Sequence, residues 1–282
     1  MTAFLERQYS GRAGSELLRG YTYELVRCAQ CDLAYQKAVP ASQLLDEIYN
    51  VWIPATERQR LAEARTVDEP SYWANEVHFI IEHLRRRPMD VRVLDFGMGW
   101  AEWAGMARAY GCEVYGTELS SERRNYARSI GIQTLDLEEI GKQRFHFINT
   151  EQVFEHLIDP LDILKRLSAS LTDDGVLKIS VPNSRAALRR VSRQRAFAPL
   201  SSETIMPISP LEHVNCFEYK TLVSFAAAAG LAPIRPSIRL LYNASSGWLH
   251  PARGARLLLR PIYRHIYPKS TFAYFVRTPG AC

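Results

Sequence analysis

Short apolar runs alternate with longer amphipathic runs between residues 68 and 182, and this alternation constrains the fold more than any other feature of the sequence. The apolar runs are predicted as strands over 91–95, 113–117, 132–135, 145–149 and 176–181. The amphipathic runs are predicted as helices over 70–87, 100–110, 120–130 and 160–171. Strands separated by helices of about 10 to 15 residues are typical of a parallel sheet, since parallel neighbours need a crossover connection. We therefore expect a doubly wound α/β fold.

The sequence on either side of this region is less regular, and we divide the chain into an N-terminal extension, 1–67, and a main domain, 68–282. Apolar residues at helical spacing predict a helix from Ser42 that Pro54 interrupts. The expected elements of the second half are a turn over 172–175, a basic helix over 185–194, a loop over 197–210, a helix over 218–229 and a strand at the sheet edge over 270–276.

Charge and cysteine content narrow the setting of the protein. The chain has 282 residues, a formal net charge of +5 and five cysteines. So few cysteines in a chain of this length predict a reducing, cytoplasmic environment. The apolar runs are shorter than the roughly 20 residues that cross a bilayer, and the first residues lack a signal-peptide pattern. Much of the positive charge lies in 185–195 and 253–264, where solvated helix faces are the simplest interpretation.

A glycine-rich loop follows the first predicted strand, in the sequence Asp95-Phe96-Gly97-Met98-Gly99. Glycines let a backbone approach a ligand closely, and the next helix offers free N–H groups, so the loop predicts a nucleotide site. The dinucleotide fingerprint needs a third glycine where this sequence has Glu102, which disfavours the pyrophosphate of NAD. Asp95 also repels phosphates, but it suits a ligand that carries sulfonium and ammonium groups.

Two further carboxylates follow the next strands. Glu118 ends the second strand, 21 residues beyond Gly97, which is the spacing at which an acidic side chain binds ribose hydroxyls. Its alternative role is a charge at the start of the helix that Ser120 and Ser121 begin. Asp136, after the third strand, is placed for an adenine amino group or is an ordinary loop carboxylate.

These motifs resemble the class I methyltransferases that use S-adenosylmethionine. The matching segments occur in the family's order over roughly 70–282, at 93–100, 115–120, 152–160, 174–183 and 212–217. The resemblance implies a Rossmann-like, mostly parallel, seven-stranded sheet with an N-terminal extension. It implies S-adenosylmethionine as the cofactor, in contact with Tyr72, Asp95, Phe96, Gly97, Gly99, Trp100, Glu118, Leu119, Asp136, Leu137 and Gln152.

The chain departs from the family pattern at three positions. Ala101 replaces the third glycine of the first motif, which we interpret as a mild change, and His146 replaces an aspartate at the start of the fourth strand. Quinone-pathway members carry Glu-x-x-Glu-His after that strand, linked there to a metal. This chain has Gln152 for the first Glu, so we expect no metal.

Two histidines are the candidate catalytic residues. Methyl transfer is a displacement at an activated sulfonium, so a base is needed only if the acceptor must lose a proton. His156 lies just past the fourth strand, at the edge where such sheets bind ligands, and His213 lies on a later loop. Either is also explained as a histidine that is hydrogen-bonded within its own turn. Tyr72, Trp73, Trp100 and Trp103 are candidates for the cofactor's methionine end or for the core.

Cys28 and Cys31 resemble half of the zinc ribbon at the N-terminus of some sugar and antibiotic methyltransferases. A structural zinc needs four ligands, and the sequence has no second Cys-x-x-Cys, so we expect two ordinary thiols.

The function that this resemblance implies is methyl transfer to a small-molecule acceptor, such as a sugar nucleotide or a secondary metabolite. A nicotinamide oxidoreductase is opposed by Glu102. An RNA-binding or non-catalytic module would use arginines 185, 189, 190, 193 and 195, but interleaved aromatic residues are missing there, and we expect no stable nucleic-acid partner. The apolar and basic segment 253–264 leaves peripheral contact with a membrane or a lipid-linked acceptor open.

Overall fold

The computed structural model describes residues 2–13, 18, 20–52, 68–194, 202–235 and 270–278. These residues belong to two compact units. The sheet unit comprises Val67–Phe154, Asp159–Val181 and Leu222–Cys282, and the small unit comprises Met1–Thr66, Glu155–Ile158 and Pro182–Thr221. The small unit therefore combines the N-terminal segment with two later segments.

A seven-stranded sheet forms the centre of the sheet unit, in the order β5-β4-β3-β6-β7-β10-β9. The strands are β3 (Arg92–Phe96), β4 (Glu113–Thr117), β5 (Gln133–Thr134), β6 (Phe145–Glu151), β7 (Leu171–Pro182), β9 (Leu231–Ile234) and β10 (Ser270–Arg277). From β5 to β7 the neighbours are parallel, and β10 pairs with β9 antiparallel. The predicted fold class is confirmed.

The expected edge position of the last strand is wrong. β10 lies between β7 and β9, so β9 forms the edge. The sequence of β9 is only four residues long and contains Pro233, which lacks the N–H that a central strand would need. A proline of this kind is tolerated at an edge. Because it interrupts the apolar run, the sequence pattern did not predict this strand.

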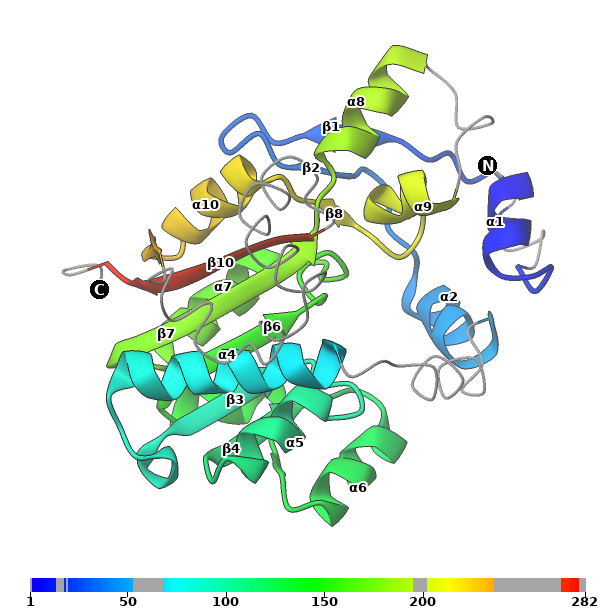
Figure 1. Cartoon of the computed structure of the whole chain (residues 1–282). Helices are drawn as coiled ribbons and strands as arrows, with labels where there is room; N and C mark the ends of the chain where they lie inside the picture. The colour runs from blue at the N-terminus through cyan, green and yellow to red at the C-terminus, as the bar shows by residue number, and fades with distance from the viewer. Residues whose placement is uncertain are drawn as a thin grey trace, which may run out of the picture. The chain divides into compact units, whose positions relative to one another are not determined.

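The helices that pack on the sheet begin and end close to their predicted positions. They are α4 (Asp68–Leu84), α5 (Glu102–Ala109), α6 (Ser121–Ser129), α7 (Pro160–Ala169) and α10 (Tyr219–Ala227). Figure 1 shows α4 crossing in front of the strands. It ends before the predicted Arg87 because Arg85 adopts a positive φ of 52°. The indole of Trp103 on α5 stacks on Phe147 of β6, with ring centroids 5.6 Å apart.

The turn predicted over 172–175 lies inside β7. Phe145 pairs with Leu171 and Phe147 with Val176, so five steps along β7 face two steps along β6. The extra residues between Leu171 and Val176 form a bulge in β7, and regular pairing with β6 resumes at Val176. A Cβ on Gly175 would lie 2.9 Å from the carbonyl oxygen of Phe145 and 3.0 Å from backbone atoms of Thr172.

The small unit has its own sheet and its own core. β1 (Leu25–Arg27), β2 (Ala34–Gln36) and β8 (Asn215–Cys216) form an antiparallel sheet. Its helical segments are α1 (Thr2–Gln8), α2 (Ser42–Glu47), the π-helix η1 (Ile48–Trp52), α8 (Arg185–Gln194), α9 (Ser202–Ile205) and the 3-10 turn η4 (Met206–Ile208). The predicted basic helix is confirmed as α8. The predicted loop over 197–210 is wrong for residues 202–208, which are helical, and its first residues lie outside the described ranges.

Apolar side chains from both ends of the small unit share one core. Leu5, Trp52, Ala187, Ile205 and Cys216 are all buried in it. Within the parts of the chain that the structure covers, no helix combines the length and the apolar character needed to cross a bilayer.

The bulge in β7 generates a test of the fold. Gly175→Ala places a methyl group against backbone atoms that cannot move aside, so we expect the free energy of unfolding to fall by about 1–3 kcal/mol. Gly141→Ala is the matched control, because a Cβ there meets nothing within 4 Å. Urea denaturation of both variants measures the difference, and equal stabilities would contradict the bulge geometry.

Candidate functional site

The glycine loop leaves β3 at Phe96 and is pinned to the end of β4. The backbone N–H of Gly97 donates to Thr117 Oγ1 at 3.0 Å, and that of Met98 to the Thr117 carbonyl at 2.9 Å. Gly97 has a φ of 74°, and a Cβ on it would lie 2.6 Å from Val153 Cγ2. The first glycine is therefore required by its conformation and by the close approach of Val153.

Ala101 precedes α5 with a φ of 60° and a ψ of 31°, in the left-handed region. A side chain in this region costs roughly 1–2 kcal/mol, so replacing the family's glycine here is more than the mild change expected from the sequence. The Ala101 side chain is buried in the core of the sheet unit. Packing of its methyl group thus offsets part of the strain.

Glu118 bridges the glycine loop and the start of α6. One carboxylate oxygen accepts the backbone N–H of Gly99 at 3.0 Å, and the other accepts that of Ser120 at 2.9 Å. The Arg123 guanidinium lies 3.5 Å away. A carboxylate offers about four acceptor positions, so Glu118 keeps capacity for further donors.

Apolar surface lies exposed beside Glu118. Leu119 is fully exposed, and its exposed fraction is the highest of any large apolar side chain among the described residues. The indole of Trp100 is half-buried, with its ring edge-on to Tyr126 at 5.7 Å and near the Arg123 guanidinium at 5.9 Å. Leu137, the first residue of the 3-10 turn η3 (Leu137–Lys142), is also half-buried.

Asp136 caps its own 3-10 turn. Its side chain and that of Glu139 form a reciprocal capping box, and Arg124 donates to its carboxylate at 2.7 Å. The side chain is 59% exposed, which leaves it accessible to a ligand. Asp136 therefore has the role of a loop carboxylate that begins a 3-10 turn.

Asp95 is buried at the end of β3. Asn149 on β6 donates its amide N–H to the carboxylate at 2.8 Å. Burial raises the pKa of Asp95 to about 7, although the hydrogen bond from Asn149 and the charge of Lys178 oppose this rise. The Asn149 side-chain oxygen is itself buried and finds no donor among the described residues.

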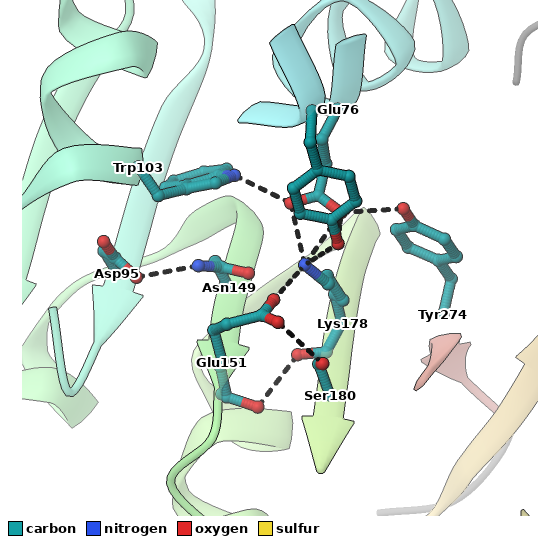
Figure 2. A network of polar contacts seen from close by, with 10 residues as sticks. Glu76, Asp95, Trp103, Asn149, Glu151, Lys178, Ser180 and Tyr274 are labelled. Atoms are coloured by element: carbon teal, nitrogen blue, oxygen red, sulfur yellow. Dashed lines mark hydrogen bonds and ion pairs between the residues drawn. The ribbon is translucent and has the colours of Figure 1, made fainter. Parts of the chain in front are cut away.

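A buried lysine next to this pair was not predicted. Lys178 Nζ on β7 lies 2.8 Å from the Glu76 carboxylate and 2.5 Å from that of Glu151 (Figure 2). It also donates to the Tyr72 hydroxyl at 3.0 Å. Burial has the largest single effect and lowers the pKa of Lys178, but the charges of Glu76, Tyr72, Glu151 and Tyr274 together outweigh it, so the pKa is raised well above its ordinary value.

Glu76 connects this cluster to two further elements. The indole N–H of Trp103 on α5 donates to it at 2.8 Å, and the Tyr274 hydroxyl on β10 at 2.9 Å. The signals in the sequence were a lysine inside the apolar run 176–181 and a glutamate on the apolar face of α4. Both break the expected pattern, because charged residues are seldom fully buried without a partner.

Two of the predicted cofactor residues, Tyr72 and Gln152, lie on α4 and just after β6, outside the glycine loop and the end of β4. Tyr72 belongs to the Lys178 cluster, and burial raises the pKa of its phenol. Gln152 is exposed just after β6, with a positive φ of 55° and a backbone N–H that donates to the Ser180 carbonyl at 2.8 Å. The structure thus assembles Asp95, Tyr72 and the glycine loop within one unit.

The two predicted catalytic histidines lie together in the small unit. Their ring centroids are 4.9 Å apart, in an edge-to-face arrangement. His156 Nδ1 lies 2.8 Å from the carbonyl oxygen of Glu212. Burial lowers the pKa of both histidines, that of His213 to about 3, so both are neutral near pH 7.

Cys28 and Cys31 lie in the turn between β1 and β2, and both thiols are free. Backbone N–H groups of Cys31 and Gln30 lower the pKa of Cys28, whereas burial raises that of Cys31.

The arginines on α8 at 185, 189, 190 and 193 are exposed. Arg195 and the basic segment 253–264 lie outside the described residues.

Comparison with known proteins identifies the family. A family described as "Methyltransferase domain" matches residues 60–235, which is more than half of the chain, so the chain belongs to this family. No curated protein sequence is significantly similar to it.

Solved methyltransferase structures share the fold. The plantazolicin methyltransferase BpumL with SAH aligns with a TM-score of 0.54 and 12% identity, over 83% of this chain and 94% of that one. Magnesium protoporphyrin IX methyltransferase from Synechocystis PCC 6803 with SAH gives 0.50 and 14%, over 84% and 100%. The 1,6-didemethyltoxoflavin-N1-methyltransferase of Burkholderia thailandensis gives 0.50 and 16%, over 90% and 99%. The class I fold that the motifs implied is confirmed.

The Lys178 cluster generates a stability prediction. Lys178→Met leaves Glu76 buried without its counter-charge, so we expect the free energy of unfolding to fall by about 3–5 kcal/mol. Adding Glu76→Gln removes the orphaned charge and should restore part of the loss. Urea denaturation measures both changes, with Lys165→Met on the exposed side of α7 as a control expected within about 0.5 kcal/mol. A loss of similar size in the control would contradict the assignment.

Asp95 generates a pH prediction. Its folded pKa of about 7 lies above the ordinary 3.8, so the folded state keeps a proton that the unfolded state releases. The stability that Asp95 contributes is therefore full below pH 3.8 and is lost as pH rises toward 7. Asp95→Asn has no such proton to lose. Urea unfolding at a series of pH values should show wild-type stability falling relative to this variant over that window, and a constant difference would refute the raised pKa.

Proposed function

We propose that this protein is an S-adenosylmethionine-dependent methyltransferase that acts on a small-molecule acceptor. The observation that carries the proposal is the loop from Gly97 to Ala101, whose backbone is tied to the Glu118 carboxylate through Gly99. Membership of the methyltransferase family supports it. The three similar structures were solved with S-adenosylhomocysteine, the product that the cofactor leaves.

The nucleoside part of the cofactor is assigned to the end of β4 and the turn after β5. We propose that Glu118 accepts the ribose hydroxyls with its remaining lone pairs and that Gly97 and Gly99 let the backbone approach. Leu119 and Leu137 would cover the adenine ring, and exposed apolar surface at Leu119 would leave water on binding. Asp136 would accept the adenine amino group.

The methionine part is assigned to the end of β3 and its surroundings: Tyr72, Asp95, Phe96, Trp100 and Gln152. A cationic ligand suits this region for two reasons. The ammonium and sulfonium charges would stabilise ionised Asp95, and an ammonium N–H would satisfy the buried oxygen of Asn149, which has no donor among the described residues. A pyrophosphate would instead meet two carboxylates, Asp95 and Glu102.

The acceptor side is assigned to the segment that follows β6. Methyl transfer needs chiefly the alignment of nucleophile, methyl carbon and sulfur, an effect worth up to about 7–11 kcal/mol. We propose His156 and His213 as the residues that meet the acceptor. The similar structures are named for small acceptors, namely a desmethylPZN analog, magnesium protoporphyrin IX and 1,6-didemethyltoxoflavin, and these favour a small molecule.

Removing the Glu118 carboxylate tests this assignment. Glu118→Ala should weaken S-adenosylmethionine binding by about tenfold to a hundredfold, because a charged hydrogen bond contributes roughly 1.5–3 kcal/mol. Isothermal titration calorimetry measures the dissociation constant. Glu122→Ala, on the first turn of α6, is the matched control and should bind as the wild type does. An unchanged constant for Glu118→Ala would remove the ribose assignment.

A further inference from the structure

Three potential metal ligands meet within the small unit. One ligand atom from each of Glu155, His156 and His213 lies within 4.8 Å of the other two. His156 Nε2 is 3.8 Å from Glu155 Oε1. The Glu155 and His213 side chains are buried, and that of His156 is 29% exposed, so an ion there would be held by the protein yet reachable from solvent.

The hydrogen bond of His156 Nδ1 fixes the tautomer of its ring. The carbonyl oxygen of Glu212 can only accept, so the proton of the neutral ring lies on Nδ1, and Nε2 presents its lone pair toward the Glu155 carboxylate. A histidine that donates its second N–H to a backbone carbonyl is the usual arrangement of a metal-bound imidazole.

His213 adds an independent sign of a missing partner. Its side chain is 8% exposed, and its Nδ1 has no hydrogen-bond partner within the described part of the chain. Leaving such an atom buried and unpaired costs about 1–3 kcal/mol. A cation bound among the three ligand atoms that lie within 4.8 Å of one another would give His213 a partner.

The backbone around the cluster is held in place by the rest of the small unit. The amide group of Asn215 donates to the Leu157 carbonyl at 2.7 Å, and its backbone N–H donates to that of Glu155 at 2.9 Å. Gln36 donates to the His213 carbonyl at 3.0 Å, and Tyr9 fixes the Glu212 carboxylate at 2.7 Å. The site is therefore built before any ligand arrives.

We propose that Glu155, His156 and His213 bind one divalent transition-metal ion, with Zn²⁺ as the best-matched ion. Two imidazoles and one carboxylate are a ligand set of catalytic zinc sites, which keep a fourth position for water or substrate. Mg²⁺ and Ca²⁺ prefer oxygen ligands alone. In a tetrahedral site, ligands about 2.1 Å from zinc lie about 3.4 Å from one another, so the widest pair of ligand atoms must close by up to about 1.4 Å on binding.

This site differs from the ligand pattern considered in the sequence. Gln152, which led us to expect no metal, takes no part, and the third ligand comes from His213, 57 residues after His156. The inference goes beyond the proposed function and does not rest on it.

Zinc titration of the full chain, stripped with a chelator, tests the proposal. Cys28→Ser with Cys31→Ser is the working background, because the thiol pair can bind zinc by itself. We expect calorimetry to show one zinc per chain in this background. Glu155→Gln or His213→Gln should weaken binding by about a hundredfold or more. His78→Gln on the surface of α4 is the matched histidine control and should bind like the background.

Cobalt substitution gives a second readout that does not depend on affinity. Co²⁺ at this site should show visible d–d bands without a sulfur-to-metal charge-transfer band. Circular dichroism checks that each variant is folded. No zinc binding in the background would overturn the proposal, as would binding that persists in both folded ligand variants. All metal titrations are done without S-adenosylmethionine. A failure to bind zinc would therefore not count against the methyltransferase proposal, and a failure to bind S-adenosylmethionine would not count against the zinc site.

Discussion

The buried ammonium group of Lys178 is the interaction on which the sheet unit depends. It joins β7 to Glu76 and Tyr72 on α4 and to Glu151 on β6, and Glu76 extends the cluster to α5 and β10. An isolated charge in such a place would destabilise the fold by several kcal/mol. Lys178 therefore holds α4 against β6 and β7. In this way its ammonium group helps to position both α4 and the strand ends near Asp95.

The charges around this lysine also favour one kind of ligand. This region holds three carboxyl groups, those of Glu76, Glu151 and Asp95, around one lysine, and burial raises the pKa of Asp95 to about 7. A cationic ligand would relieve this imbalance, whereas a pyrophosphate would increase it. The charges of the sheet unit therefore support the proposal that its glycine loop binds S-adenosylmethionine rather than NAD. In the loop sequence, Glu102 supports the same proposal.

The sequence predicted the parts of the fold that local patterns control. The parallel strands from β3 to β7 and the helices between them follow from apolar runs and amphipathic spacing. β9 was missed because Pro233 interrupts a very short strand. Nothing in the pattern of residues 182–221 indicates that they join the N-terminal segment, because that union rests on the pairing of β2 with β8. Spacing along the sequence predicts the glycine loop and Glu118 as site residues. Lys178 and Asn149 could not be predicted in this way, because their roles depend on partners distant in sequence. The meeting of His156 with His213 is long-range in the same way.

Ligand selection by the wild-type chain tests the central claim most directly. Calorimetric titrations with S-adenosylmethionine, S-adenosylhomocysteine and NAD, each at the same protein concentration and ionic strength, compare a cationic ligand, its neutral-sulfur product and a pyrophosphate at one site. The charge distribution around Lys178 predicts that the first two bind with one molecule per chain and that NAD does not. Binding of NAD in the absence of S-adenosylmethionine binding would contradict the account.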